Sequence, residues 1–177
     1  VQYNVQSSEK EKFDGVMLDI EPYISDSWKE NPEEYMDRYI SCMKKGYKFA
    51  QKNHLRTAIC IPRHYDNQGL TSGLEELIKE TCDEVAVMNY SCGNEIEAIR
   101  TEAALSEKYG KELHCILEFQ EVGKHGLTEN KTYRNKGIDN AKETWEKLQK
   151  EYKNINVTRD YHWSRPVREM LEEKNAD

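Results

Sequence analysis

The chain has 177 residues, enough for one domain with a sizeable core, and acidic residues outnumber basic ones by 33 to 26, for a net charge of -7. No basic stripe runs along the sequence, so nucleic acid is excluded as a partner. No apolar run approaches the roughly 20 residues that span a bilayer, so a membrane is excluded as well.

The first half of the chain predicts a strand and then a long helix. Residues 1–12 are polar and charged, lack a signal-peptide pattern, and are expected to be the tail of a preceding helix or loop. FDGVMLDI (13–20) is a short apolar run that predicts a buried strand. The helix begins with Asn31 as N-cap, Pro32 at its first position and Glu34 closing a capping box. Its inward stripe is expected to hold Met36, Ile40, Met43, Tyr47 and Ala50.

Two more strands frame a short helix in the middle of the chain. LRTAICIP (55–62) predicts the second strand, and LEELIKETC (74–82) predicts an amphipathic helix that Thr71 or Ser72 caps. DEVAVMNY (83–90) predicts the third strand. The strand–helix alternation therefore continues without a break.

The second half repeats the same alternation. Asn94 and Glu97 predict a capping box at the start of a helix that Gly110 stops, and ELHCILEF (112–119) predicts the fourth strand. The remaining elements are a polar segment at 120–137, a helix over 138–152 with Trp145 and Tyr152 in its apolar stripe, a more polar strand at 154–163, and a final helix at 167–177.

Continuous apolar strands that alternate with helices predict a parallel sheet covered by helices, which is an α/β fold. An open doubly wound sheet and a (β/α)8 TIM barrel both fit this order. No glycine-rich phosphate loop follows a strand, whereas polar and aromatic residues follow each one, and this favours the barrel. Since a barrel has eight strands, residues 1–177 are expected to form one partial barrel domain holding strands four to eight. The missing N-terminal half of the barrel would then be a partner.

Two carboxylates, Asp19 and Glu21, stand two residues apart at the end of the first apolar run. In a strand they point to the same side, while Ile20 points away. Hydrolysis of a glycosidic bond needs a carboxylic acid that is still protonated near neutral pH, and a neighbouring carboxylate raises the pKa of such an acid. The pair therefore predicts acid/base chemistry, with a solvated strand end as the plain alternative.

The segment FDGVMLDIE resembles the signature D-G-x-D-x-D-x-E of the family 18 glycoside hydrolases, the chitinase family, through Asp14, Gly15, Asp19 and Glu21. The resemblance implies a TIM barrel that acts on a β-linked glycan, in which Glu21 is the general acid and Asp19 orients it and the acetamido group of the substrate. Met17 replaces one carboxylate of the signature.

The segment VMNYS is similar to the family's M-x-Y-D on the sixth strand, through Met88 and Tyr90, with Ser91 in place of the aspartate. Tyr90 is then expected to orient the reacting group. Trp163 matches the aromatic floor of the family's sugar site by its position after the last strand.

A looser resemblance connects the chain to the clan A retaining glycosidases, through Glu21-Pro22 after the first strand and Glu118 after the fourth. In this layout Glu118 is the nucleophile, and Glu118 or Glu121 should lie roughly 5 to 5.5 Å from Glu21. The plain alternative for Glu118 is a hydrogen bond to a sugar hydroxyl or to a loop.

Substrate binding is predicted for residues that follow the strands: Trp163, Tyr23, Asn89, Tyr161, Glu121 and His64. Aromatic faces stack on the apolar faces of sugar rings. The aromatic residues expected at the barrel mouth are Tyr23, Trp28, Tyr65, Tyr90, Tyr133, Tyr161 and Trp163. An oligosaccharide or polysaccharide is the predicted substrate.

No metal and no cofactor is predicted. The five histidines form no H-x-H or H-E-x-x-H motif, and the five cysteines are scattered singly, as ordinary half-buried thiols are. The first alternative function is a non-catalytic carbohydrate-binding barrel, because Met17 and Ser91 stand where the family has carboxylates. A metal-dependent barrel hydrolase is the third.

Overall fold

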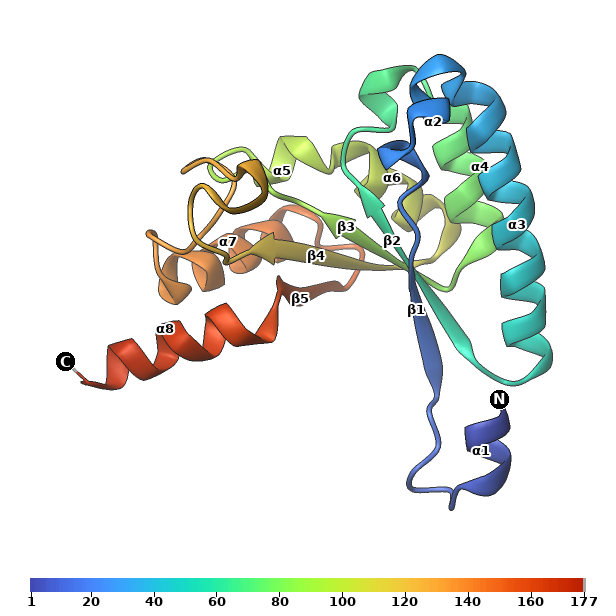
Figure 1. Ribbon diagram of the computed structural model, residues 1–177, viewed down its shortest axis with the longest axis horizontal. Coiled ribbons are helices and arrows are strands. Elements are labelled where there is room, and N and C mark those ends of the chain that lie inside the picture. Colours follow the sequence, from blue (N-terminus) through green and yellow to red (C-terminus); the bar gives the residue numbers. More distant parts are fainter. Residues whose placement is uncertain (177) are drawn as a thin grey trace. The chain divides into compact units, whose positions relative to one another are not determined.

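The computed structural model describes residues 1–176 (Figure 1). Five strands form a parallel sheet in the order β1-β2-β3-β4-β5, flanked by helices, so the predicted α/β class and the strand–helix order are confirmed. The strands are β1 (Gly15–Asp19), β2 (Arg56–Pro62), β3 (Glu84–Met88), β4 (Glu112–Glu118) and β5 (Val157–His162).

Eight helices and three short 3-10 turns complete the described residues. The helices are α1 (Gln2–Gln6), α2 (Asp26–Glu30), α3 (Pro32–Lys52), α4 (Thr71–Thr81), α5 (Glu95–Ala98), α6 (Arg100–Tyr109), α7 (Ile138–Glu151) and α8 (Ser164–Ala176), and the turns are η1 (Pro22–Ile24), η2 (Asp66–Gln68) and η3 (Lys124–Gly126). Among them, none combines the length and the apolar character that crossing a bilayer requires.

The chain divides into two compact units. The N-terminal unit comprises Val1–Ile61 and Tyr65–Val85, and the C-terminal unit comprises Pro62–His64 and the chain from Ala86 onward. Each unit has its own packed helices and its own candidate residues, and each is described by itself.

In the N-terminal unit, β1 pairs with β2 in parallel, from Gly15 opposite Arg56 to Asp19 opposite Cys60. Glycine is required at the start of β1, because a Cβ at Gly15 would lie 2.9 Å from the carbonyl oxygen of Arg56. Helices α3 and α4 lie side by side in this unit (Figure 1).

The predicted start of the long helix is confirmed. The Asn31 side chain accepts a hydrogen bond from the Glu34 N–H at 3.4 Å and donates one to the Glu34 carboxylate at 2.8 Å. The inward stripe is buried at Met36, Ile40, Met43 and Ala50 and half-buried at Tyr47. The predicted cap of α4 is wrong. Thr71 already belongs to the helix, and the N-cap residue of α4 is Leu70, whose side chain forms no hydrogen bond.

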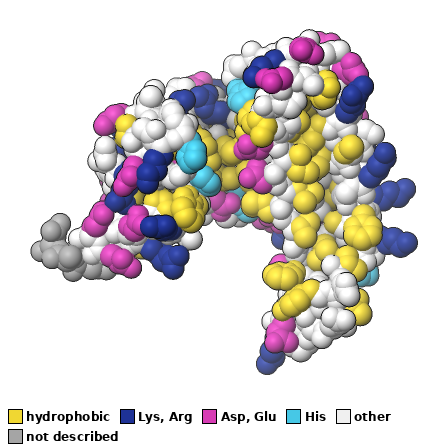
Figure 2. Space-filling model, in the orientation of Figure 1, with side chains coloured by type: hydrophobic (Ala, Val, Ile, Leu, Met, Phe, Trp, Pro, Cys, Tyr) yellow, Lys and Arg dark blue, Asp and Glu magenta, His cyan; other side chains and the backbone are white. Residues whose placement is uncertain are grey.

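The prediction of a strand in FDGVMLDI is confirmed by β1, but the prediction that this strand is buried is wrong. β1 ends the order of strands, and Val16, Met17 and Ile20 remain 37%, 50% and 46% exposed. Figure 2 shows hydrophobic side chains gathered on the visible face of the N-terminal unit. An apolar run indicates that a strand is suited to burial, but no described residue covers these side chains of β1.

In the C-terminal unit, β4 and β5 pair in parallel, from Leu113 opposite Val157 to Glu118 opposite His162. Helix α7 packs on β5 through its apolar stripe, in which Trp145 is buried and donates a hydrogen bond from Nε1 to the carbonyl oxygen of Cys115 at 2.9 Å. The prediction of Trp145 as a core residue is therefore confirmed.

One predicted helix is broken in two. The non-helical backbone of Ile99 separates α5 from α6. Asn94 makes no side-chain cap, and Glu97 pairs with Arg100 instead of closing a capping box. Gly110 ends α6 in the left-handed conformation (φ 63°), as predicted.

Candidate functional site

In the N-terminal unit, Asp19 and Glu21 lie at the carboxyl end of β1 together with Tyr23. Asp19 is the last residue of β1 and is exposed, and Glu21 is half-buried at the start of η1. The Tyr23 hydroxyl donates a hydrogen bond to the Glu21 carboxylate, and Asp19 lies near enough for its charge to act on the same phenol. The three side chains therefore form one acidic cluster.

The phenol of Tyr23 stays protonated in this cluster. Burial is the largest effect that raises its pKa, and the hydrogen bond to Glu21 and the negative charges of Glu21 and Asp19 raise it further. Tyr23 is thus a permanent donor to Glu21. Its ring meets that of Tyr65 edge-on at 6.1 Å, and Tyr65 in turn lies 5.5 Å from Trp28, so packed aromatic rings support Tyr23 from behind.

In the C-terminal unit, Glu118 and His162 face each other at the carboxyl ends of β4 and β5. The Nδ1 atom of His162 lies 2.9 Å from Oε2 of Glu118. Glu118 is 2% exposed, and its Oε1 accepts the backbone N–H groups of Phe119 and Gln120, each at 2.8 Å. A buried carboxylate with these donors is fixed in place.

The hydrogen bonds also decide the charge of Glu118. Burial alone would raise its pKa, but the bonds from His162 and Gln120 together outweigh burial and leave the pKa below the ordinary value of 4.5. An ionised carboxylate only accepts hydrogen bonds, so Nδ1 of His162 must carry a proton. Glu118 is therefore an orienting residue for His162.

Aromatic side chains surround His162. Its ring lies 6.1 Å from that of Tyr90, inclined at 32°. Tyr161 is 50% exposed and Trp163 is 45% exposed, and Tyr161 meets the buried ring of Phe119 edge-on at 6.4 Å. The end of β5 thus presents an imidazole and two accessible aromatic rings.

A second cross-strand pair lies further back on β4 and β5. The Nδ1 atom of His114 lies 2.9 Å from Oδ2 of Asp160. His114 and Glu118 share one face of β4, and Asp160 and His162 share one face of β5, because side chains alternate along a strand. This face of β4 therefore carries His114 and Glu118, with Ile116 between them.

The remaining predicted ligand residues have other surroundings. Asn89 is 1% exposed and donates to the Glu95 carbonyl oxygen at 2.9 Å, so its side chain ties two backbone segments together and offers no surface to a sugar. Glu121 is exposed and pairs with Lys124 at 2.9 Å. The side-chain hydrogen bond to Lys124 is the largest effect that lowers the pKa of Glu121. His64 is half-buried.

Three of the aromatic residues expected to stack on sugars are instead core residues. Trp28, Tyr65 and Tyr133 are 3%, 0% and 4% exposed, so no ring face remains for a ligand. Aromatic residues after strands pack equally well under loops, and the sequence does not distinguish the two cases.

The structure brings the predicted residues together in two sets. Asp19, Glu21 and Tyr23 belong to the N-terminal unit, and Tyr90, Glu118, Tyr161 and Trp163 belong to the C-terminal unit. His162 was not among the predicted catalytic or sugar-binding residues. The signal for it is strand pairing: HCILEF and DYHW end opposite each other, which puts His162 beside Glu118.

Comparison of the chain with protein-family models, with curated proteins and with solved structures finds no match.

Proposed function

We propose that this protein is a glycoside hydrolase that cleaves a β-linked glycan containing N-acetylhexosamine, and that its parallel sheet is part of a (β/α)8 barrel. The observation that carries the proposal is the acidic cluster at the end of β1, where Tyr23 donates a hydrogen bond to Glu21 beside Asp19. Polar residues at the carboxyl ends of parallel strands are where barrel enzymes hold their catalytic groups.

The chemistry assigns a different task to each residue. Glu21, in its protonated form, gives its proton to the glycosidic oxygen as the bond from that oxygen to the anomeric carbon breaks. The acetamido oxygen of the substrate bonds to the anomeric carbon, and Asp19 stabilises the positive charge that develops on the acetamido group. The Glu21 carboxylate then takes a proton from the water that opens this intermediate, while Tyr23 holds Glu21 in position.

A second function, glycan binding without cleavage, is favoured by one observation. Met17 is half exposed on the same side of the strand as Asp19, where the chitinase signature has a carboxylate, while Tyr161 and Trp163 present accessible rings after β5. Stacking rings without a complete acidic set would bind a sugar and leave it intact.

The test measures release of a fluorescent aglycone from β-linked N-acetylglucosamine oligomers. Glu21→Gln should lower kcat by at least about 100-fold, because a positioned general acid contributes about 10²- to 10⁴-fold, while oligosaccharide binding persists. Glu30→Gln, which replaces an exposed carboxylate at the end of α2 in the same unit, is the matched control and should leave kcat unchanged.

Unchanged turnover in Glu21→Gln would refute Glu21 as the acid. If the wild-type protein binds the oligomers and cleaves none of them between pH 4 and 9, the binding function replaces the hydrolase.

A further inference from the structure

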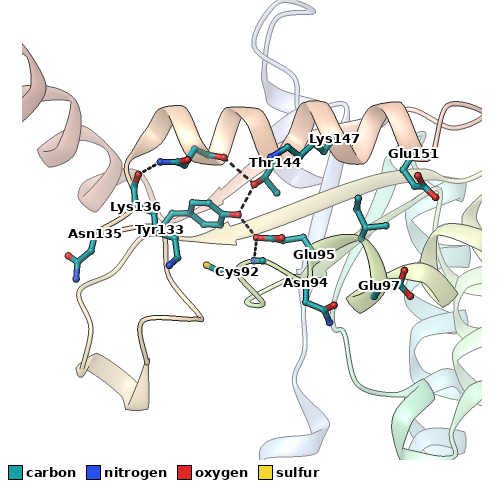
Figure 3. A pocket seen from close by; sticks show the side chains of 13 residues that line it. Cys92, Asn94, Glu95, Glu97, Tyr133, Asn135, Lys136, Thr144, Lys147 and Glu151 are labelled. Carbon is teal, nitrogen blue, oxygen red and sulfur yellow. Dashed lines mark hydrogen bonds between the residues drawn. The ribbon is translucent and has the colours of Figure 1, made fainter.

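The C-terminal unit contains a cavity of about 850 Å³, and Tyr133 is the one predicted barrel-mouth residue that lines it. Its walls are the segment from Cys92 to Glu97, the loop around Tyr133–Lys136, and one stripe of α7 (Figure 3). The backbone joins two of these walls, because the Cys92 N–H donates to the Asn130 carbonyl oxygen at 2.8 Å. The size is that of a small-ligand pocket.

Glu95 lies at the floor of this cavity and is only 7% exposed. Its Oε1 accepts two hydrogen bonds, one from the Gly93 N–H at 2.9 Å and one from the Tyr133 hydroxyl. The Tyr133 hydroxyl also lies 2.7 Å from the Thr144 hydroxyl on α7. Figure 3 shows this chain of polar groups along the cavity.

The other carboxylate oxygen of Glu95 has no donor. Among residues 1–176, the hydrogen bonds to the Glu95 carboxylate all end on Oε1. Oε2 is not among the buried atoms that lack a hydrogen-bond partner, so it is accessible from the cavity. Glu95 is therefore nine-tenths buried, and its Oε2 remains available to a ligand that enters the cavity.

The charges around Glu95 indicate which kind of hydrogen-bond donor a ligand would present to its Oε2. Glu95, Glu97 and Glu151 give the lining three carboxylates against two lysines, and Lys147 is already 4.0 Å from Glu143. Lys136 pairs with no described carboxylate, and its charge and that of Glu95 act with opposite signs on the pKa of the Cys92 thiol. A divalent cation would require several oxygen ligands, and the floor offers one open oxygen.

We propose that this cavity binds a small ligand that carries a primary ammonium group next to oxygen acceptors, as an amino sugar or an amino acid does. The ammonium donates to Oε2 of Glu95, and the oxygen acceptors of the ligand face Lys136. A charged donor on a carboxylate gives a hydrogen bond about twice as strong as a neutral one, so the ammonium is the group that the site recognises.

The experiment titrates the isotope-labelled full chain with D-glucosamine, glycine and N-acetyl-D-glucosamine, and follows the backbone amide of Gly93 by NMR. This amide should shift with either amine, because its acceptor Glu95 gains a second partner. The acetylated sugar, which keeps the hydroxyl groups and lacks the ammonium, should bind at least about tenfold more weakly than glucosamine. Binding of glucosamine alone identifies an amino sugar, and equal binding of glycine identifies an amino acid.

Glu95→Gln keeps the acceptor for Gly93 and Tyr133, removes the charge, and should weaken amine binding at least about tenfold. Glu146→Gln is the matched control, because Glu146 is exposed on α7 and does not line the cavity, and it should bind as the wild type does. The proposal is overturned if the Gly93 amide of the wild type responds to neither amine, or if the acetylated sugar binds as tightly as glucosamine.

Discussion

Glu118 is the residue whose charge state the structure defines most clearly. Its folded-state pKa lies below 4.5, because the hydrogen bonds from His162 and Gln120 outweigh the effect of burial. A lowered pKa in the folded state stabilises the fold at pH values above the ordinary pKa, and this contribution disappears as the pH falls through the folded-state pKa. The stabilisation by Glu118 should therefore be lost in acid.

Glu118→Gln tests this expectation. At neutral pH the variant should be less stable than the wild type by about 2 kcal/mol, because an amide cannot replace an anion that accepts several hydrogen bonds. The difference should shrink as the pH falls below 4.5, since protonation removes the same charge from the wild type. Urea unfolding at a series of pH values measures it. Glu129→Gln, an exposed change in the same unit, is the control, and a difference that does not depend on pH would contradict the assignment.

At the scale of elements, two helical glycines in the N-terminal unit have opposite surroundings. A Cβ at Gly73 in α4 would lie 2.6 Å from Cγ of Met36, a fully buried residue of α3, whereas a Cβ at Gly46 in α3 would meet nothing within 4 Å. The absence of a side chain at Gly73 lets α3 and α4 approach closely. At Gly46 the glycine only costs helix stability.

Alanine substitutions should therefore act in opposite directions. Gly73→Ala should lower the free energy of unfolding by about 1 to 2 kcal/mol through overpacking, and Gly46→Ala should raise it by about 0.5 to 1 kcal/mol through helix propensity. Thermal and urea unfolding of both variants measure the difference. Two changes of the same sign would show that α3 and α4 do not pack as described.

At the scale of the whole molecule, local and periodic sequence patterns predicted the helices and strands. They did not predict which residues pair across strands or which residues are buried. The spacing of apolar residues and the capping box at Asn31 predicted β2, β3 and α3 because these signals depend on neighbours in the sequence. Asp19 and Glu21 were identifiable from their spacing at the end of an apolar run, although Glu21 lies beyond β1, at the start of η1. The pairing of His162 with Glu118 depends on strand register, and the cavity above Glu95 depends on three segments that only tertiary structure joins.

The reactivity of the five cysteine thiols tests burial across the whole chain. Among residues 1–176, none of the five cysteines forms a disulfide: Cys42 is exposed, Cys92 is half-buried, and Cys60, Cys82 and Cys115 are buried. Burial is the main effect that raises the pKa of Cys92 to about 11 and that of Cys115 to about 12.

Because the thiolate is the reactive form, a disulfide reagent at about pH 8 should modify one thiol of the native protein quickly and all five after denaturation. Cys42→Ser should remove the fast reaction and leave the total after denaturation one lower. Several fast thiols in the native protein would mean that β2, β4 and the end of α4 are open to solvent, which the buried positions of Cys60, Cys115 and Cys82 do not permit.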